Sequence, residues 1–356
     1  MIKRLIDFFS SLKLTIFNFA VLMIMVFAAT MEQTDAGIFF VKKRYFESPF
    51  GYLIGILIFV NLIAAHVVSF KLKWRKIGIW LIHLGVIVLV VGAGLTSCTA
   101  VESQMAIQEG QTKHYSESTT TSELAVTLAD ETQDKVIAFP ETYLKKDEIR
   151  HSDLPFRMKV LAYFPNSRLD FGEGSQATQG FGTQLRLTAA PLIKKDDYRN
   201  MASAYVEILD KDTSLGVWML SSWLKAPQLV HVGGKTYRVA VRPARYYNDY
   251  SITLLDFRHD IYPGTDIPKN FSSEVLLKDP TTKEERKERI YMNHPLRYKG
   301  KTFYQASFGK NDTMSVFQVV ENRGWLFPYI SSALVSLGLL IHFGLLLVRH
   351  LRKTWA

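Results

Sequence analysis

Residues 77–96 read IGIWLIHLGVIVLVVGAGLT, twenty residues without a single Asp, Glu, Lys or Arg. About 20 predominantly apolar residues are needed for a helix to cross the roughly 30 Å hydrocarbon layer of a bilayer. Three further stretches meet this condition, at about 12–30, 50–70 and 326–348. The sequence therefore predicts a polytopic α-helical membrane protein with four transmembrane helices.

The region between the third and fourth spans has a different character. It is polar and long enough to bury a core of its own. We therefore expect three parts: a three-helix membrane region over 1–96, an extracytoplasmic β-rich domain over 97–325, and a fourth helix with a basic tail over 326–356.

The basic residues indicate the orientation of the spans. The formal net charge is +10, which alone would be compatible with nucleic-acid binding. The basic residues gather instead beside the spans, at Lys3, Arg4 and Lys13, at Lys71, Lys73, Arg75 and Lys76, and at Arg349, Arg352 and Lys353. Such clusters mark cytoplasmic flanks. We expect both termini in the cytoplasm and the large domain outside the cytoplasmic membrane of a bacterium, although Lys42, Lys43 and Arg44 in the 31–49 loop oppose this orientation.

Cysteine usage excludes several functions. Cys98 is the only cysteine, so the chain has no internal disulfide, no C-x-x-C redox pair and no C-x-x-C-H for covalent haem attachment. Leu95–Cys98 resembles a lipoprotein cleavage box, but it follows the third span, so we interpret Cys98 as an interfacial thiol. The first span has no clean A-x-A cleavage site, and we expect it to be retained as a helix.

Short segments rich in β-branched and aromatic residues predict strands in the central domain. These segments are Thr236–Val241, Ser251–Phe257, Ser273–Leu277, Arg289–Met292, Thr302–Ser307 and Ser315–Val320. Tyr298–Lys301 contains Gly300 and predicts a hairpin turn before Thr302. The Gly/Ser/Asn-rich and then charged stretch over 165–200 predicts a loop or a junction. The spacing is typical of a sandwich or barrel.

Short connections make the first three spans antiparallel neighbours, so we expect these three helices to pack together. Gly85, Gly92 and Gly94 in the third span would provide flat surfaces for close helix approach.

Three spans each contain one histidine, namely His66, His83 and His342. At 1.5 Å per residue, each is expected about 6–9 Å inside the cytoplasmic boundary. Ionisable groups at such depths are candidates for function, and imidazole is a common axial ligand of haem iron. His83 leads, with His66 and His342 as secondary candidates, and Lys73, Arg75 and Lys76 could neutralise haem propionates. The alternative is that each histidine only hydrogen-bonds across a helix interface.

The central domain lacks the signatures of a standalone enzyme. Its five histidines have no metal-ligand spacing, and His294 is expected in a turn. Asp256, His259 and Asp260 look triad-like, but no serine stands in a nucleophile elbow. No phosphate-binding loop and no H-E-x-x-H occur.

Four stretches resemble the ResB family of cytochrome c biogenesis proteins, the haem-handling subunit of the system II cytochrome c synthase. They are Ser11–Thr15 (SLKLT), His83–Gly85 (HLG), Ile267–Ser273 (IPKNFSS), and Asn293–Gly300 (NHPLRYKG) running into Phe303–Ser307 (FYQAS). The last stretch is the most specific. The resemblance extends to the order of three spans, a large domain and a final span.

The resemblance implies a component of a holocytochrome c synthase rather than a standalone enzyme. Such proteins act with a CcsA/ResC-like partner that carries a tryptophan-rich W-W-D segment, which is missing here. His83 matches the family's third-helix histidine and would ligate haem b. The partner, or alternatively His66 or His342, would supply the second ligand. Apocytochrome c would be the acceptor, and another protein would reduce its thiols. The other possibility is a membrane-anchored apocytochrome chaperone that does not ligate haem.

Overall fold

The computed structural model describes residues 2–69, 74–128, 134–193, 199–264, 268–309 and 312–354. These residues form two compact units. The helical unit lies within residues 2–101 and 321–354, and the β unit comprises residues 102–193 and 199–320.

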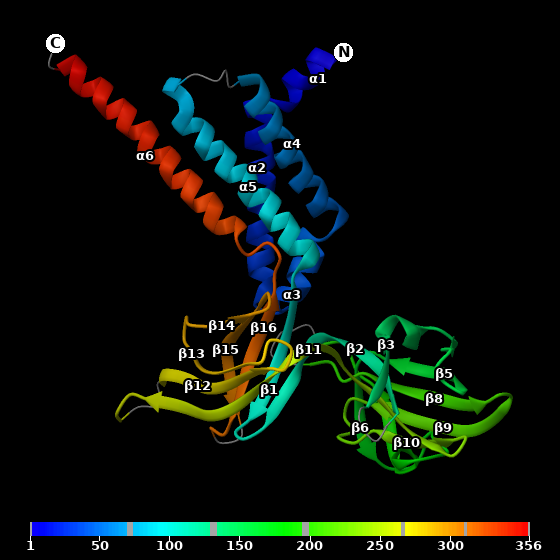
Figure 1. Ribbon diagram of the computed structural model, residues 1–356. Helices are drawn as coiled ribbons and strands as arrows, with labels where there is room; N and C mark the ends of the chain where they lie inside the picture. Colours follow the sequence, from blue (N-terminus) through cyan, green and yellow to red (C-terminus); the bar gives the residue numbers. More distant parts are fainter. Residues whose placement is uncertain are drawn as a thin grey trace. The chain divides into compact units, whose positions relative to one another are not determined.

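The helical unit contains four long helices and several short ones (Figure 1). In chain order they are α1 (Ile2–Phe9), α2 (Leu12–Gln33), α3 (Ile38–Val41), the π-helical turn η1 (Lys42–Phe46), α4 (Pro49–Ser69), the 3-10 turn η2 (Trp74–Lys76), α5 (Ile77–Thr99) and α6 (Phe327–Thr354). Helices α2, α4, α5 and α6 are long and apolar enough to cross a membrane. The four helices predicted from hydropathy are therefore present, whereas α1, α3 and η1 were not predicted.

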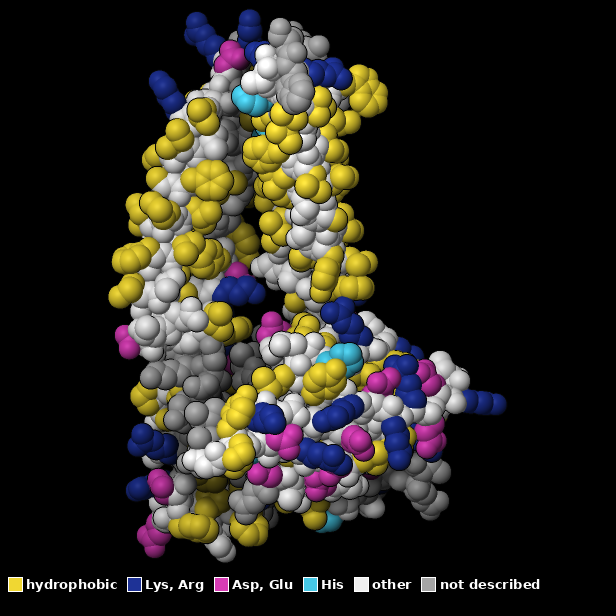
Figure 2. All heavy atoms as spheres, turned by 90° about the vertical axis from the view of Figure 1, so that its left-hand side faces the viewer, with side chains coloured by type: hydrophobic (Ala, Val, Ile, Leu, Met, Phe, Trp, Pro, Cys, Tyr) yellow, Lys and Arg dark blue, Asp and Glu magenta, His cyan; other side chains and the backbone are white. Residues whose placement is uncertain are grey.

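The surface of the helical unit agrees with its hydropathy. Hydrophobic side chains cover the sides of the helices, and Lys and Arg side chains gather at one end (Figure 2). An apolar lateral surface of this kind is what lipid tails would cover.

A polar cluster joins α1, α2 and α4. The side chain of Ser11 caps α2 by accepting a hydrogen bond from the backbone N–H of Lys13 at 3.2 Å. The Thr15 hydroxyl donates to Asn61 Oδ1 of α4 at 2.7 Å, and Asn61 Nδ2 donates to the Phe9 carbonyl at 2.6 Å. Two residues of the SLKLT stretch thus fix the start of α2 against α4.

The glycine-bearing face of α5 packs on α6, in addition to the contacts of α4 with α2 and with α5 that were expected for the first three spans. Gly78, Gly85 and Gly92 recur every seven residues, so they share one face of the helix. A Cβ atom at Gly85 would lie 2.7 Å from Val335 Cγ2, and one at Gly78 would lie 2.6 Å from the Gly338 carbonyl oxygen. Ser331 Oγ also donates to the Gly85 carbonyl at 2.8 Å.

This pairing follows from the chain connections. Helix α5 leads into the strand β1 (Val101–Gln108), and α6 follows the strand β16 (Met314–Glu321). Strands β1 and β16 are hydrogen-bonded neighbours in one sheet. The adjoining helix ends therefore meet, and the Thr96 hydroxyl donates to Asn322 Oδ1 at 3.1 Å.

The β unit contains most of β1 and β16 together with fourteen other strands (Figure 1). These are β2 (Thr112–Leu128), β3 (Lys135–Pro140), β4 (Glu148–Ile149), β5 (Phe156–Phe164), β6 (Ser167–Phe171), β7 (Leu185–Ala189), β8 (Ser203–Asp210), β9 (Thr213–Ser221), β10 (Gln228–Val232), β11 (Lys235–Ile261), β12 (Pro268–Asp279), β13 (Glu284–Tyr291), β14 (Leu296–Tyr298) and β15 (Lys301–Gly309). The β-rich character predicted for the region between the third and fourth long helices is confirmed.

The strands form three sheets. The largest runs β13-β12-β11-β2-β1-β16-β15-β14, with β10 added to β11 and β3 to β2. A second sheet runs β4-β5-β8-β9, and β6 pairs with β7. The β6–β7 hairpin lies in the stretch over 165–200 that was expected to be a loop or junction.

The long strand β11 contributes to two cores. Val239 and Val241 of β11 belong to one core, and Ile252 and Leu254 belong to the other. The segments predicted as separate strands at Thr236 and Ser251 are thus two ends of β11. Register shifts between Pro243/Arg245 and Tyr247/Ile252 interrupt its pairing with β2, and such bulges bend a strand.

The predicted hairpin turn at Tyr298–Lys301 is present. Tyr298 of β14 pairs with Lys301 of β15, so the loop has two residues. Lys299 and Gly300 both have positive φ, 44° and 78°, which is the requirement of a type I′ turn.

Candidate functional site

The structure brings together two of the three histidines that the sequence singled out. His66 of α4 and His83 of α5 have ring centroids 5.8 Å apart, with an angle of 30° between the ring planes. Both side chains are partly exposed. Helices α4 and α5 therefore place two imidazoles side by side.

Trp80 contacts His66 and was not recognised from the sequence. Its ring centroid lies 4.0 Å from that of His66, with the planes at 74°. Trp80 and His83 are three residues apart on α5, so both face α4. The sequence signal that could have identified Trp80 is its position about one helical turn before an intramembrane histidine.

His342 lies at a different level. A Cβ atom added to Gly78 would meet the backbone N and the Cβ of His342 at 2.6 and 2.8 Å. Gly78 precedes His83 by five residues, about 7.5 Å along the helix. Five residues also turn α5 by about 140°, so the face that meets α6 is not the face that carries His83. The shared level expected for three histidines thus holds for His66 and His83 only, and His342 contacts Phe343 on its own helix.

The basic residues expected beside the site are only partly described. Lys73 lies outside the described residues, and so does the side chain of Arg75. Lys76 is exposed at the start of α5, seven residues before His83. It is therefore available to an acidic group near that end of the helix.

The donor set fits a haem iron. Metal–nitrogen bonds to histidine are about 2.0–2.1 Å and a ring centre lies roughly 1 Å further on, so two imidazoles on opposite sides of one iron have centroids about 6 Å apart. The observed separation of 5.8 Å matches this value. Within the part of the chain that is described, no cluster of three or more His, Cys, Asp or Glu residues could hold a free metal ion.

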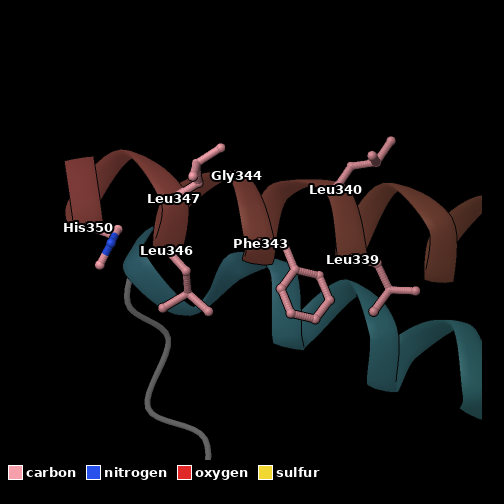
Figure 3. A pocket seen from close by; sticks show the side chains of 7 residues that line it. All are labelled: Leu339, Leu340, Phe343, Gly344, Leu346, Leu347 and His350. Atoms are coloured by element: carbon pink, nitrogen blue, oxygen red, sulfur yellow. The ribbon is translucent and has the colours of Figure 1, made fainter.

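Helix α6 carries a separate, apolar groove of about 640 Å³ (Figure 3). It is lined by Leu339, Leu340, Phe343, Gly344, Leu346, Leu347 and His350. Its only ionisable side chain is that of His350, at one end. A leucine-rich helix face is a typical lipid contact.

The β unit does not assemble the triad-like residues into a site. Asp256 pairs with Arg258 at 2.6 Å, whereas His259 Nδ1 lies 3.3 Å from Asp312 Oδ1. The His259 ring stacks on Phe271 at 4.6 Å. His294 lies in a turn as predicted, because the Tyr291 and His294 backbones exchange two hydrogen bonds.

Parts of this chain are similar to known proteins. Residues 228–324 match the ResB-like family. The chain is 30% identical to Protein NrfI of Wolinella succinogenes over 289 residues, which cover 81% of this chain and 29% of that protein. A solved structure, Cytochrome c Heme Lyase CcmF, aligns over 90% of this chain and 34% of its own, with 9% identity and a TM-score of 0.22. A score this low does not support a common fold.

Four helices long and apolar enough to cross a membrane, a β-rich unit between the third and fourth of them, and two neighbouring histidines on α4 and α5 define a protein with a large β unit and a candidate ligand site in its helices. Within this chain, residues 228–324 carry the match to the ResB-like family. The chain spans less than a third of the length of the curated relative that it matches.

Proposed function

We propose that this chain is the haem-handling subunit of a membrane-bound cytochrome c synthase. The match of residues 228–324 to the ResB-like family and the similarity to Protein NrfI support a role in cytochrome c biogenesis. The observation that carries the haem assignment is the placement of the His66 and His83 imidazoles side by side in apolar helices. Polar groups are expensive in a bilayer, and histidines there are candidates for ligand binding.

In this proposal haem b is a cargo that the chain holds in the membrane. His83 acts as an axial ligand, and a CcsA/ResC-like partner supplies the second. Lys76, with Lys73 and Arg75, neutralises the propionates at the cytoplasmic side. Both termini lie in the cytoplasm and the β unit lies outside the bacterial cytoplasmic membrane.

The acceptor is apocytochrome c. Each thioether forms when a cysteine S–H of the C-x-x-C-H motif adds across a haem vinyl group, which consumes no electrons but requires reduced thiols. Cys98 is the only thiol of this chain. A separate reductant therefore keeps the acceptor thiols reduced, and the β unit holds or shields the acceptor during transfer.

A second candidate function is that of an apocytochrome chaperone that does not ligate haem. Two exposed aromatic side chains of the β unit favour this alternative. Phe171 and Phe181 are 84% and 69% exposed. Apolar side chains this exposed are typical of protein-binding surfaces.

The two candidates differ in what His83→Ala does. The full chain, co-expressed and purified with its partner, should show a haem Soret band. His83→Ala should reduce haem occupancy about tenfold or more, and added imidazole should restore part of it. His294→Ala is the matched control, since His294 is exposed in a turn of the β unit.

Unchanged haem occupancy in His83→Ala would refute ligation by His83 and favour the chaperone. Cytochrome c maturation that survives deletion of the whole gene would refute both candidates.

A further inference from the structure

The second axial ligand is the least constrained part of the proposed site. His83 can share an iron with a histidine of another protein or with one of its own chain. Within its own chain, His66 on the neighbouring helix α4 places an imidazole ring in contact with that of His83.

The pair has the spacing that one iron requires. A centroid separation of 5.8 Å is close to the roughly 6 Å expected of two imidazoles bound to opposite sides of an iron atom. The two rings come from different helices, so a planar ligand would lie between α4 and α5.

Trp80 limits how the His66 ring can turn. The two rings meet edge to face at a centroid separation of 4.0 Å, a favourable arrangement for an aromatic pair. Trp80 stands on the helix that carries His83. The orientation of His66 is thus set by the element that presents the other ligand.

The helix faces that carry the two histidines each include a glycine about three turns away. Gly55 precedes His66 by eleven residues and Gly94 follows His83 by eleven, which is about three turns and returns to the same face. A Cβ atom at either glycine would meet nothing within 4 Å. The faces that carry the histidines are thus open at these two positions.

We propose that His66 is the second axial ligand when the chain is alone, so that the subunit by itself forms a bis-imidazole haem site. This inference rests on the proposed function. It adds that the partner's ligand replaces His66 rather than filling an open position. A cargo held by two ligands of one chain remains bound until the partner arrives.

The test uses the full-length chain, expressed without its partner and purified in detergent, with ferric haem added. Two strong nitrogen ligands produce a six-coordinate low-spin iron, and loss of one produces a high-spin iron. We expect low-spin absorption and electron paramagnetic resonance spectra for the unaltered chain. His66→Ala should yield a high-spin spectrum and a roughly tenfold or greater loss of haem affinity.

Two further variants separate ligation from folding. Added imidazole should return His66→Ala to low spin while the haem still co-elutes with the protein in gel filtration, which free haem–imidazole complexes would not do. His66→Met should remain low-spin with a raised reduction potential, because a Met/His pair favours the reduced iron. His350→Ala is the matched control, since His350 lies at the end of the groove on α6.

The outcomes distinguish this inference from the proposed function. A low-spin spectrum in His66→Ala, together with haem loss in His83→Ala, would overturn the role of His66 and leave the haem-handling function standing. Haem binding that is the same in His83→Ala and in the unaltered chain would overturn both.

Discussion

The carboxylate of Asp279 connects two hairpin turns of the β unit. It ends β12, where its Oδ1 accepts the backbone N–H of Thr281 at 2.8 Å. Its Oδ2 lies 2.6 Å from Lys299 Nζ and accepts the Tyr298 hydroxyl at 2.8 Å. Lys299 also reaches Asp249 at 2.7 Å. The Tyr-Lys-Gly part of the NHPLRYKG stretch thus fixes one turn against the other.

This ion pair makes stability depend on acid pH. The Lys299 ammonium holds the pKa of the Asp279 carboxyl well below its ordinary value of 3.8. A depressed pKa contributes stability that is complete above the unfolded pKa and lost as the pH falls below it. Lys299→Met should therefore lower the unfolding temperature at pH 7, and the difference from the unaltered protein should shrink between about pH 5 and pH 2.

Thermal unfolding of the purified protein across this pH range checks the prediction. Lys301→Met is the matched control, because Lys301 donates to the neutral amide of Asn248 at 2.6 Å. Its effect should not change with pH over the same range. A difference for Lys299→Met that stays constant down to pH 2 would contradict the proposed role of Asp279.

At the candidate site, a residue could be predicted from the sequence where the pattern that identifies it lies within a single chain segment. His66 and His83 stand out because an ionisable group in an apolar span is rare. Trp80 does not stand out, since tryptophan is common at the ends of membrane spans. The separation of His342 from His83 depends on how α6 packs on Gly78, and depth estimates for single helices contain no packing information.

At the scale of elements, the glycines of α5 divide into packed and open positions. Gly85 is packed, since an added Cβ would lie 3.0 Å from the Ser331 carbonyl oxygen and nearer still to Val335. Gly94 is open. The same substitution should therefore be much more destabilising at Gly85 than at Gly94.

Gly85→Leu should lower the free energy of unfolding by about 1–3 kcal/mol, because overpacking forces α5 and α6 apart. Gly94→Leu should change it by less than about 0.5 kcal/mol. Thermal unfolding in detergent measures the stability change of both variants. Limited proteolysis reports whether α5 and α6 have moved apart. Equal effects of the two variants would show that Gly85 is not part of a tight helix interface.

The partners of elements were less predictable than the elements. Hydropathy located all four long helices, but their grouping follows from the pairing of β1 with β16, two strands separated by about 200 residues. Such long-range pairing leaves no local pattern. The joining of two predicted strands into β11 has the same origin, since its two halves belong to different cores and are linked through bulges.

At the scale of the whole molecule, hydropathy, charge and chain order predict an orientation in the membrane. Three clusters of Lys and Arg flank the predicted cytoplasmic ends of the helices, and the group at 42–44 opposes them. The positive-inside rule weighs short loops and span ends, so three clusters outweigh one. The proposed transfer of haem to an acceptor outside the cytoplasm depends on this orientation.

The single cysteine allows a direct test. Cys98 is exposed near the end of α5 that leads into β1. A membrane-impermeant maleimide should label it in intact spheroplasts. In the variant Cys98→Ser with Lys353→Cys, the new thiol stands in an exposed position near the end of α6 and should react only after lysis. Denatured samples of both variants provide the control for full reactivity. The reverse labelling pattern would place the β unit in the cytoplasm, where it could not meet an acceptor outside, and the proposed function would fail with the topology.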